Sequence, residues 1–333
     1  MKTVMFRGSG KVEIEDVPRP EAGPDAVLVQ VKASAICGSE LHAFRGPARD
    51  RPDRYNDGHE VAGVIVEAPD DSPYPVGTPV GACVVQGCGT CDACRAGRET
   101  ACGHKRYYGW NGHSEYYVLG LNGVRPIPEG VDWPAAAILT GDGLGVPVRC
   151  ARRLGETKGQ RVVVLGLGPI GLSCVLVQSF GGARVLGADI VDYRARMALA
   201  LGAERGVNVE QADLKEAVLE WTDGRGADVV ILCVAKDEAV RTAISLLRHQ
   251  GTFFLLAELA AAEFVLNDTL IRKEITMMGS WYYAGRDWQR MLELHEAHLP
   301  YEKLVTHTFG CERVQEAYDT FVSGESGKVI LTW

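Results

Sequence analysis

The chain has 333 residues, of which 46% are hydrophobic and 23% are charged. These proportions exclude a disordered chain, and the length is too great for one ordinary core, so we expect a globular protein of two domains. The formal net charge is −8 and no block of lysine and arginine occurs. Most of the surface would therefore repel a nucleic acid, and we expect no partner of that class.

The sequence does not predict a membrane protein. The longest apolar stretch, residues 162–177, is interrupted by three glycines and a proline, whereas a membrane span needs roughly 20 unbroken apolar residues. The apolar run at the start, M-K-T-V-M-F-R, is too short for a signal peptide. We therefore expect a cytoplasmic protein with no membrane partner. Because the cytosol keeps thiols reduced, its ten cysteines favour metal binding over disulfides.

The amino-terminal part of the chain is predicted to be β-rich. Residues 12–15 alternate between apolar and polar side chains, and residues 26–31 and 61–66 are almost all strand formers. Glycine and proline separate these runs, as they do between short strands.

Two short stretches within this part contain residue types that bind zinc, namely C-G-S-E-L-H at 37–42 and G-H-E at 58–60. A lone cysteine is usually a small core residue, and a lone histidine is usually a surface or hydrogen-bonded one. A catalytic zinc, however, needs three protein ligands and an open fourth position. Cys37 and His59 could supply two of those ligands.

A cluster of four cysteines follows, at positions 88, 91, 94 and 102. Four thiolates this close can enclose one tetrahedral zinc, and such a closed site has no position for substrate, so we expect a structural zinc. Disulfides and buried free cysteines are the alternatives. The expected compartment disfavours disulfides, and packing alone rarely produces three cysteines at a spacing of three. We interpret the remaining thiols, apart from Cys37, as ordinary buried cysteines: Cys83, Cys150, Cys174, Cys233 and Cys311.

Beyond residue 160 the pattern changes to apolar strands that alternate with helical stretches. We expect strands at 161–166, 183–189, 205–209, 227–234, 251–257 and 276–280, and helices at 193–201 and 237–247. This alternation is typical of a parallel sheet with helices on both faces. One further helix, at about 288–298, and a strand at 328–332 are expected near the carboxyl end.

The first of these strands leads directly into G-L-G-P-I-G at 166–171, and a helical run follows. The motif is weak by itself, but the strand–turn–helix context indicates a dinucleotide site. The first glycine permits a tight turn, the second lets the backbone approach a pyrophosphate, and the third lets the helix pack close to the strand. The helix amino terminus offers free N–H groups to the anion. We expect cofactor contacts from Gly166, Gly168, Pro169, Ile170 and Gly171.

Asp189 ends the second of these strands, 18 residues after Gly171. A carboxylate there would accept hydrogen bonds from both adenosine ribose hydroxyls and repel the 2′-phosphate of NADP, so we expect NAD. Arg194 is the next basic residue and belongs to the expected cofactor-binding set. A turn or helix-capping role is the alternative for Asp189.

Together these pieces resemble the zinc-dependent medium-chain dehydrogenase/reductase family, which includes the zinc alcohol and polyol dehydrogenases. The matching stretches are C-G-S-E-L-H, G-H-E-V-A-G-V, the four-cysteine loop, G-L-G-P-I-G and the segment 272–280, in that order. The resemblance implies a GroES-like β-rich catalytic domain of residues 1–146 and 284–333. It also implies a Rossmann NAD-binding domain of residues 147–283 and a homodimer or homotetramer.

For the first two stretches, the resemblance implies that Cys37 and His59 bind the catalytic zinc and that Glu60 lies beside it. It also implies that Ser39 and His42 carry the proton from the substrate to solvent, and histidine side chains titrate near neutral pH.

The third ligand departs from the family pattern. It is often a cysteine in the family, but Asp142 stands at that place here, and zinc accepts carboxylate oxygen. We therefore expect Asp142 to be the third ligand. Two alternatives are open: Asp142 could cap a helix that begins near Val146, or Glu60 could bind the metal instead. A second departure is W-N-G-H at 110–113, which replaces a more glycine-rich loop.

The expected activity is hydride transfer between NAD and an alcohol, which is a secondary alcohol, a polyol or a sugar derivative. Zinc would act as a Lewis acid on the substrate hydroxyl. The alternatives are a zinc-free quinone or enoyl reductase of the same fold and a non-catalytic sensor that binds NAD and zinc. Three ligands with an open position argue against both. Trp110, Tyr282 and Tyr283 are candidate walls of the substrate pocket, unless they are core residues.

Overall fold

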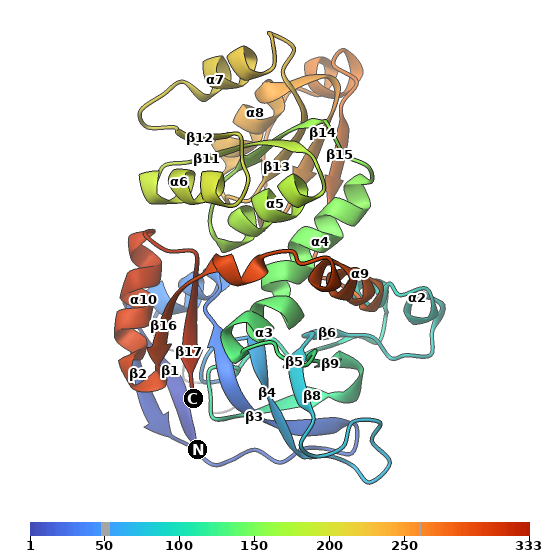
Figure 1. The fold of residues 1–333 in the computed structure, drawn as a ribbon, viewed down its shortest axis with the longest axis vertical. Coiled ribbons are helices and arrows are strands. Elements are labelled where there is room, and N and C mark those ends of the chain that lie inside the picture. Colours follow the sequence, from blue (N-terminus) through green and yellow to red (C-terminus); the bar gives the residue numbers. More distant parts are fainter. Residues whose placement is uncertain (48–53, 260) are drawn as a thin grey trace. The chain divides into compact units, whose positions relative to one another are not determined.

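The computed structural model describes residues 1–47, 54–259 and 261–333. The chain forms two compact units, one made of Met1–Gly145 and Tyr282–Trp333 and the other of Val146–Trp281. Both ends of the chain therefore belong to the first unit (Figure 1). Among the described residues, no helix is both long and apolar enough to cross a membrane.

The first unit is β-rich, as predicted, and is built on a seven-stranded sheet. The order is β16-β17-β3-β4-β5-β9, and β8 also pairs with β3. The strands are β3 (Ala26–Ala35), β4 (Glu60–Glu67), β5 (Pro79–Ala82), β8 (Tyr116–Gly120), β9 (Val124–Pro126), β16 (Val305–Gly310) and β17 (Lys328–Thr332). Two small sheets pair β1 (Lys2–Gly8) with β2 (Lys11–Asp16) and β6 (Val85–Gln86) with β7 (Arg106–Tyr107).

The first unit also contains helices and two buried cores. The helices are α1 (Leu41–Arg45), α2 (Asp92–Arg95), α3 (Trp133–Thr140), α9 (Gly285–Glu296) and α10 (Val314–Ser323). One core is formed by alternate residues of β3, β4 and β5, such as Val29, Ile65 and Val80. The other lies between α10 and strands β1 and β17, where Tyr318 and Phe321 are buried. Strand alternation therefore gives the sheet an apolar layer on each side.

The second unit contains the expected parallel sheet. Its order is β12-β11-β10-β13-β14-β15, and every neighbouring pair is parallel. The strands are β10 (Arg161–Leu165), β11 (Arg184–Asp189), β12 (Arg205–Asn208), β13 (Ala227–Leu232), β14 (Leu247–Leu255) and β15 (Thr276–Gly279). The helices are α5 (Pro169–Phe180), α6 (Asp192–Ala200), α7 (Leu214–Trp221) and α8 (Asp237–Leu246), with a π-helical turn at Asn267–Ile271.

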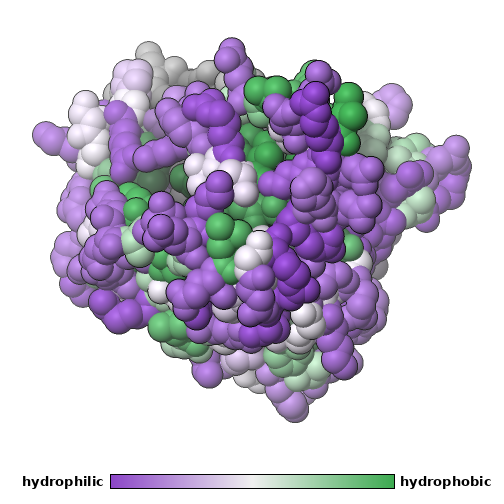
Figure 2. All heavy atoms as spheres, turned by 90° about the horizontal axis from the view of Figure 1, so that it is seen from above, coloured by the Kyte–Doolittle hydropathy of each residue, from purple (hydrophilic) through white to green (hydrophobic). Residues whose placement is uncertain are grey.

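The central strands of this sheet are apolar on both faces because helices cover both (Figure 1). Val163 and Leu165 of β10 pack in one cluster with Val218 of α7 and Val240 of α8. Their neighbour Val164 points to the opposite face by strand alternation and is also fully buried. Hydrophilic side chains cover most of the face seen in Figure 2, and apolar groups (green) lie among them.

Several boundaries differ from the expected ones. The helix expected from Val146 is α4 (Asp142–Leu154), which begins four residues earlier because Gly145 N bonds to Gly141 O at 3.0 Å and closes a first turn. Helix α9 also begins earlier, at Gly285, where Asp287 accepts a hydrogen bond from Ala284 N (2.8 Å). Both helices start where an amino-terminal N–H group finds a partner.

Candidate functional site

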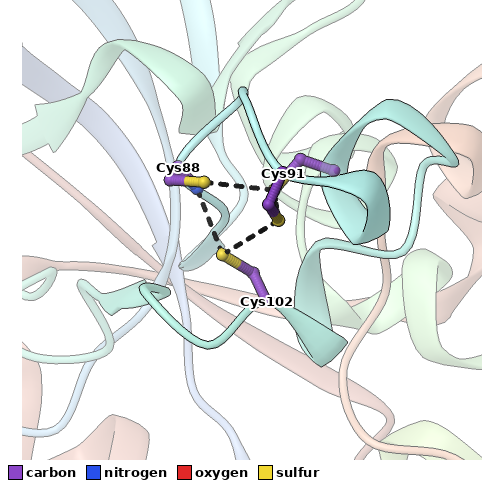
Figure 3. Close-up of side chains that lie close together, drawn as sticks. Cys88, Cys91 and Cys102 are labelled. Carbon is purple, nitrogen blue, oxygen red and sulfur yellow. Dashed lines mark hydrogen bonds between the residues drawn. The ribbon is translucent and has the colours of Figure 1, made fainter.

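The four clustered cysteines converge on one point. Cys88, Cys91 and Cys102 direct their sulfur atoms toward one another (Figure 3), and the four Sγ atoms, Cys94 included, all lie within 4.8 Å of one another. The separations are 3.5 Å for Cys91–Cys94, 3.7 Å for Cys91–Cys102 and 4.0 Å for Cys88–Cys94.

These separations are those of a tetrahedral zinc site and not of disulfides. A Zn–S bond of about 2.3 Å gives sulfur–sulfur distances of about 3.8 Å in a tetrahedron, whereas a disulfide needs about 2.05 Å. The loop is shaped around the sulfurs, because a Cβ at Gly87 would lie 2.3 Å from Cys94 Sγ. Backbone N–H groups of Cys88 and His104 donate to Cys102 Sγ at 3.4 and 3.3 Å, which favours a thiolate there.

The second group of donors comes from the two stretches singled out in the sequence. Cys37 follows β3, and His59 and Glu60 stand at the start of β4. Their ligand atoms lie within 4.8 Å of one another. The antiparallel register brings them together, because Ala35 of β3 pairs with Glu60 of β4. Residues 22 or more positions apart in the chain are thereby placed at one end of the same strand pair.

The orientation of the His59 ring is fixed by a backbone hydrogen bond. Its Nδ1 lies 2.8 Å from Asp57 O, so this nitrogen carries the proton and donates. Nε2 is then the nitrogen with the free lone pair, and it lies 3.7 Å from Asp142 Oδ2. A carbonyl that holds the far nitrogen of a histidine is the usual support of a metal ligand.

Asp142 and Glu60 differ in what already engages their oxygens. Glu60 Oε1 contacts Lys328 Nζ in an ion pair in which both side chains are fully buried, and Glu60 Oε2 accepts from Gly143 N at 3.1 Å. By distance alone Glu60, and not Asp142, completes the group with Cys37 and His59. The contacts favour Asp142, because its Oδ2 faces His59 Nε2 while both Glu60 oxygens have partners.

The charges around His59 favour a cation. Burial alone would lower the pKa of His59, but Cys37, Asp142 and Glu40 together raise it well above its ordinary value. Burial raises the pKa of Asp142 to about 7; His59 lowers that pKa and Glu60 raises it further. A pocket of buried acidic groups that stabilises extra positive charge on a histidine is suited to a divalent metal with thiolate, imidazole and carboxylate ligands.

Ser39 and His42 lie close to Cys37 in the chain but are both exposed. Ser39 is in the 3-10 turn Gly38–Glu40, and His42 is in the single turn α1. Their side chains are therefore solvent-accessible, as groups that pass a proton to water must be.

A cluster of aromatic rings lies beside His59 within the first unit. The Tyr282 ring lies edge-on to His59 with centroids 6.5 Å apart, and its hydroxyl is 2.6 Å from that of Tyr107. Trp110 packs edge-on against Tyr107 at 5.2 Å. Tyr107 and Trp110 also line a cavity of about 500 Å³ with Tyr55, Tyr108, Asn111, Tyr116 and others. Tyr283 is fully buried, with its hydroxyl on Thr140 O, so we assign it to the core and not to a pocket wall.

Three buried polar residues beside the donors were not predicted from the sequence: Glu40, His113 and Lys328. Glu40 Oε2 accepts from His113 Nε2 (3.0 Å) and from Tyr318 OH (2.5 Å), and Oε1 accepts from Cys37 N (3.1 Å). Burial raises the pKa of Glu40, but His113, His59 and the Tyr318 hydroxyl together lower it by more, so the pKa lies below its ordinary value. Glu40 lies within C-G-S-E-L-H, and its place between the expected ligand Cys37 and the expected proton carrier His42 was the available signal.

In the second unit, the glycine-rich turn has the shape that a dinucleotide needs. Gly166 has a φ of +90°, and a Cβ at Gly171 would lie 1.9 Å from Gly166 O, so only glycine allows α5 to begin this close to β10. A Cβ at Gly168 would meet nothing within 4 Å, so this side of the turn is open. Pro169 and Ile170 form the first residues of α5.

Asp189 stands at the carboxyl end of β11, next to this turn. Its Oδ2 accepts from Leu167 N at 2.6 Å and its Oδ1 accepts from Val191 N at 3.0 Å. Arg194 Nη1 lies 4.0 Å from Asp189 Oδ2. In this structure the carboxylate therefore fixes the turn, and each oxygen retains a second lone pair for a ligand.

Two of the ten cysteines are less buried than expected. Cys83, Cys150 and Cys174 are buried, but Cys233 and Cys311 are half-buried. Cys233 follows β13 and Cys311 follows β16, so both stand where the chain leaves a strand and not within the core.

Comparisons with known proteins agree with this architecture over the whole chain. Residues 23–129 match the family model for the alcohol dehydrogenase GroES-like domain, and residues 169–297 match that for zinc-binding dehydrogenases. A sorbitol dehydrogenase of Halalkalibacterium halodurans is 32% identical over 98% of this chain and 96% of its own. An L-threonine 3-dehydrogenase of Marinomonas is 31% identical over the full length of both.

Solved structures extend the similarity to the fold. Alcohol dehydrogenase TADH from Thermus sp. ATN1 superimposes with a TM-score of 0.90 at 25% identity and covers all of both chains. An Escherichia coli protein described as a short chain alcohol dehydrogenase, solved with NADH, gives a TM-score of 0.88 at 27% identity, with 100% of this chain and 99% of that one covered. The chain belongs to the zinc-dependent medium-chain dehydrogenase/reductase family, whose fold joins a GroES-like domain to a Rossmann domain.

Proposed function

We propose that this chain oxidises an alcohol to a carbonyl compound with NAD, on a zinc ion held by Cys37, His59 and Asp142. One observation carries the ligand set: His59 Nε2 lies 3.7 Å from Asp142 Oδ2, and a ring nitrogen of the same His59 lies within 4.8 Å of Cys37 Sγ. When bound, zinc supplies a Lewis acid that lowers the pKa of the substrate hydroxyl, and NAD supplies the hydride acceptor. Secondary alcohols, polyols and sugar derivatives are the substrate class, and the sorbitol dehydrogenase relative supports this choice.

In this proposal each side chain has a distinct task. The Cys37 thiolate and Asp142 carboxylate balance the charge of a divalent ion, and Asp57 O holds the His59 ring with Nε2 toward it. The Ser39 hydroxyl would accept the hydrogen bond of the substrate hydroxyl and release its own proton as it takes up the substrate's, and His42 would pass a proton on to solvent, which their exposure permits. Glu60 holds Gly143 N and the Lys328 ammonium, so it shapes the pocket from beside the metal.

The same proposal assigns the glycine-rich turn and the cysteine cluster. The open backbone at Gly168 and the amino terminus of α5 suit a pyrophosphate. Asp189, with Arg194 beside it, suits the adenosine ribose and selects NAD over NADP. Cys88, Cys91, Cys94 and Cys102 hold a second zinc that stabilises the fold and takes no part in turnover.

The test of the ligand set compares Asp142→Asn with Glu60→Gln, two variants that each replace one carboxylate oxygen by an amide. Zinc per chain and NADH formation with a panel of alcohols are measured for both. If Asp142 is a ligand, D142N should fall from about two zinc ions per chain towards one and lose activity, because a neutral amide is a poor zinc ligand. E60Q should keep both ions, since Glu60 is engaged elsewhere.

The reverse result would move the assignment to Glu60. D142N that keeps both zinc ions and near-normal turnover contradicts the proposal, and it leaves Asp142 as a first-turn residue of α4 worth about 0.3–1 kcal/mol through the helix dipole. Retained zinc at this site with no NADH formed from any alcohol would favour the non-catalytic sensor.

We also propose that the protein is cytoplasmic and works as a homo-oligomer of two or four chains. Strand β15 is an edge of the parallel sheet, and edge strands offer unpaired backbone groups to a partner. Exposed apolar side chains gather in and before it, namely Val265, Leu266, Leu270, Ile271 and Met277. A second copy of the chain would cover them, and a solution mass equal to one chain would contradict this part of the proposal.

A further inference from the structure

His113 links the two chain segments that carry Cys37 and His59. Its backbone is clamped to the segment before His59: His113 N donates to Asn56 Oδ1 and Asn56 Nδ2 donates to His113 O, each at 3.1 Å. Its side chain reaches the other segment, where Nε2 lies 3.0 Å from Glu40 Oε2. Glu40 in turn accepts from Cys37 N with its other oxygen at 3.1 Å.

The position of the ring is closely defined. His113 is fully buried, and a Cβ at Gly58 would lie 2.6 Å from its ring, so the chain next to His59 presses directly on it. On the far side, His113 Nδ1 lies 2.8 Å from Ser34 Oγ. The ring thus contacts both ligand-bearing segments and β3, and any displacement of it would move at least one of them.

The hydrogen bonds also define which ring nitrogen donates. Trp333 Nε1 can only donate, and it does so to Ser34 Oγ at 3.1 Å. The Ser34 hydroxyl proton is then available to His113 Nδ1, which leaves Nε2 to donate to Glu40. This chain of bonds runs from the carboxyl-terminal Trp333 to the backbone of Cys37 without a missing donor or acceptor.

We infer that His113 is a positioning residue that holds Cys37 and His59 at metal-binding separation before zinc arrives. The inference rests on the proposed function, because it takes these two residues as zinc ligands. A site whose ligands are already ordered loses less conformational entropy when the metal binds. Removal of a partner behind a metal ligand typically costs 10–100-fold in metal affinity, and we expect a loss of this order for zinc at this site when His113 is replaced.

The experiment compares three variants as the full, zinc-loaded chain. His113→Phe keeps the ring volume but removes both hydrogen bonds, and His113→Gln restores a donor that can reach Glu40. His295→Phe is the control, because it removes the 2.9 Å bond between Tyr301 OH and another histidine ring of the same unit and leaves His113 and Glu40 unchanged. Zinc release to a chromogenic chelator and the visible absorption of the cobalt-substituted protein are recorded for each.

H113F should release one of its two zinc ions about 10–100 times faster than the wild type and keep the four-cysteine ion. The visible spectrum of cobalt at the site that releases its metal faster should also change. H113Q should release zinc nearly as slowly as the wild type, and His295→Phe should release it at the wild-type rate. Equal release from H113F and the wild type would overturn the inference. Equal loss of both ions from H113F would also overturn it, since that indicates general unfolding.

If H113F does not fold, Ser34→Ala takes its place, because it removes the other partner of His113 without changing the packed ring. Faster release from one site supports the inference, and wild-type release overturns it. A wild-type chain that binds only the four-cysteine zinc is a separate outcome, which contradicts the proposed function and the inference with it.

Discussion

The buried pair of Glu60 and Lys328 predicts a large and specific effect on stability. Both side chains are fully buried, and Glu60 keeps only its bond from Gly143 N if the ammonium is removed from this pair. We consider Lys328→Met, which has nearly the same volume and no charge. Removal of one partner from a buried ion pair typically costs about 3–5 kcal/mol, because it leaves an uncompensated charge.

The free-energy cost of protonating Glu60 gives a similar magnitude for the loss of stability. A glutamate that must stay protonated at pH 7 costs about 3.7 kcal/mol, because its ordinary pKa is about 4.3 and each unit corresponds to about 1.4 kcal/mol. Protonation of Glu60 therefore limits the loss of unfolding free energy in K328M to about 4 kcal/mol at pH 7. At pH 5.5 the same limit is about 1.6 kcal/mol, so the variant should be less impaired in mild acid.

In the wild type, the contribution of Lys328 to stability should not change between pH 5.5 and pH 7. Burial alone would lower the pKa of Lys328, but Glu60, with Cys37 and Glu40, raises it above its ordinary value. A group with a raised pKa contributes its full stability below its unfolded value of about 10.4 and loses it only as pH rises beyond that. The Lys328 ammonium therefore keeps its charge at both pH 7 and pH 5.5.

The assay is urea unfolding followed by tryptophan fluorescence at the two pH values. The double variant Glu60→Gln/Lys328→Met should regain most of the loss, because a neutral pair leaves no buried charge and Gln keeps an acceptor for Gly143 N. Lys11→Met, an exposed lysine of β2, is the control and should stay within about 0.5 kcal/mol. A loss below about 1 kcal/mol in K328M, or a double variant no better than the single one, would refute the reasoning.

Two further predictions concern the other sites. Cys91→Ser should cost one zinc ion per chain and lower the melting temperature, because a closed structural site contributes folding free energy directly. Cys311→Ser is the control: Cys311 is half-buried and outside the cluster, so this variant should keep both its zinc and its melting temperature. If C91S keeps the zinc content and melting temperature of the wild type, the cluster holds no metal. The wild type should prefer NAD strongly over NADP, and Asp189→Ala should reduce that preference about 10–100-fold through the loss of charged hydrogen bonds. Equal catalytic efficiency of the wild type with both cofactors would contradict the role of Asp189.

Local patterns in the sequence were enough to predict the parallel sheet and the four-cysteine cluster. Strands such as β10 and β13 are mostly apolar runs of the length that a covered parallel sheet requires, so their type followed from composition, although both end one or two residues before the expected limits at 166 and 234. The cysteines lie within fifteen residues of one another, so a single short loop brings them together. In both cases neighbouring residues in the chain are enough for the prediction, and contacts between distant segments add little to it.

The surroundings of Cys37 and His59 depend instead on strand register, which hydrophobic alternation does not specify between distant strands. Lys328 reaches Glu60 across 268 positions because Ile330 of β17 pairs with Ala35 of β3, and Ala35 pairs with Glu60 of β4. A shift of one residue in either pairing would place the Lys328 and Glu60 side chains on opposite faces of the sheet. The choice between Asp142 and Glu60 as ligand turns on this contact, since Lys328 is what engages Glu60. The identity of the third ligand was therefore open in the sequence, because it depends on how three distant segments align.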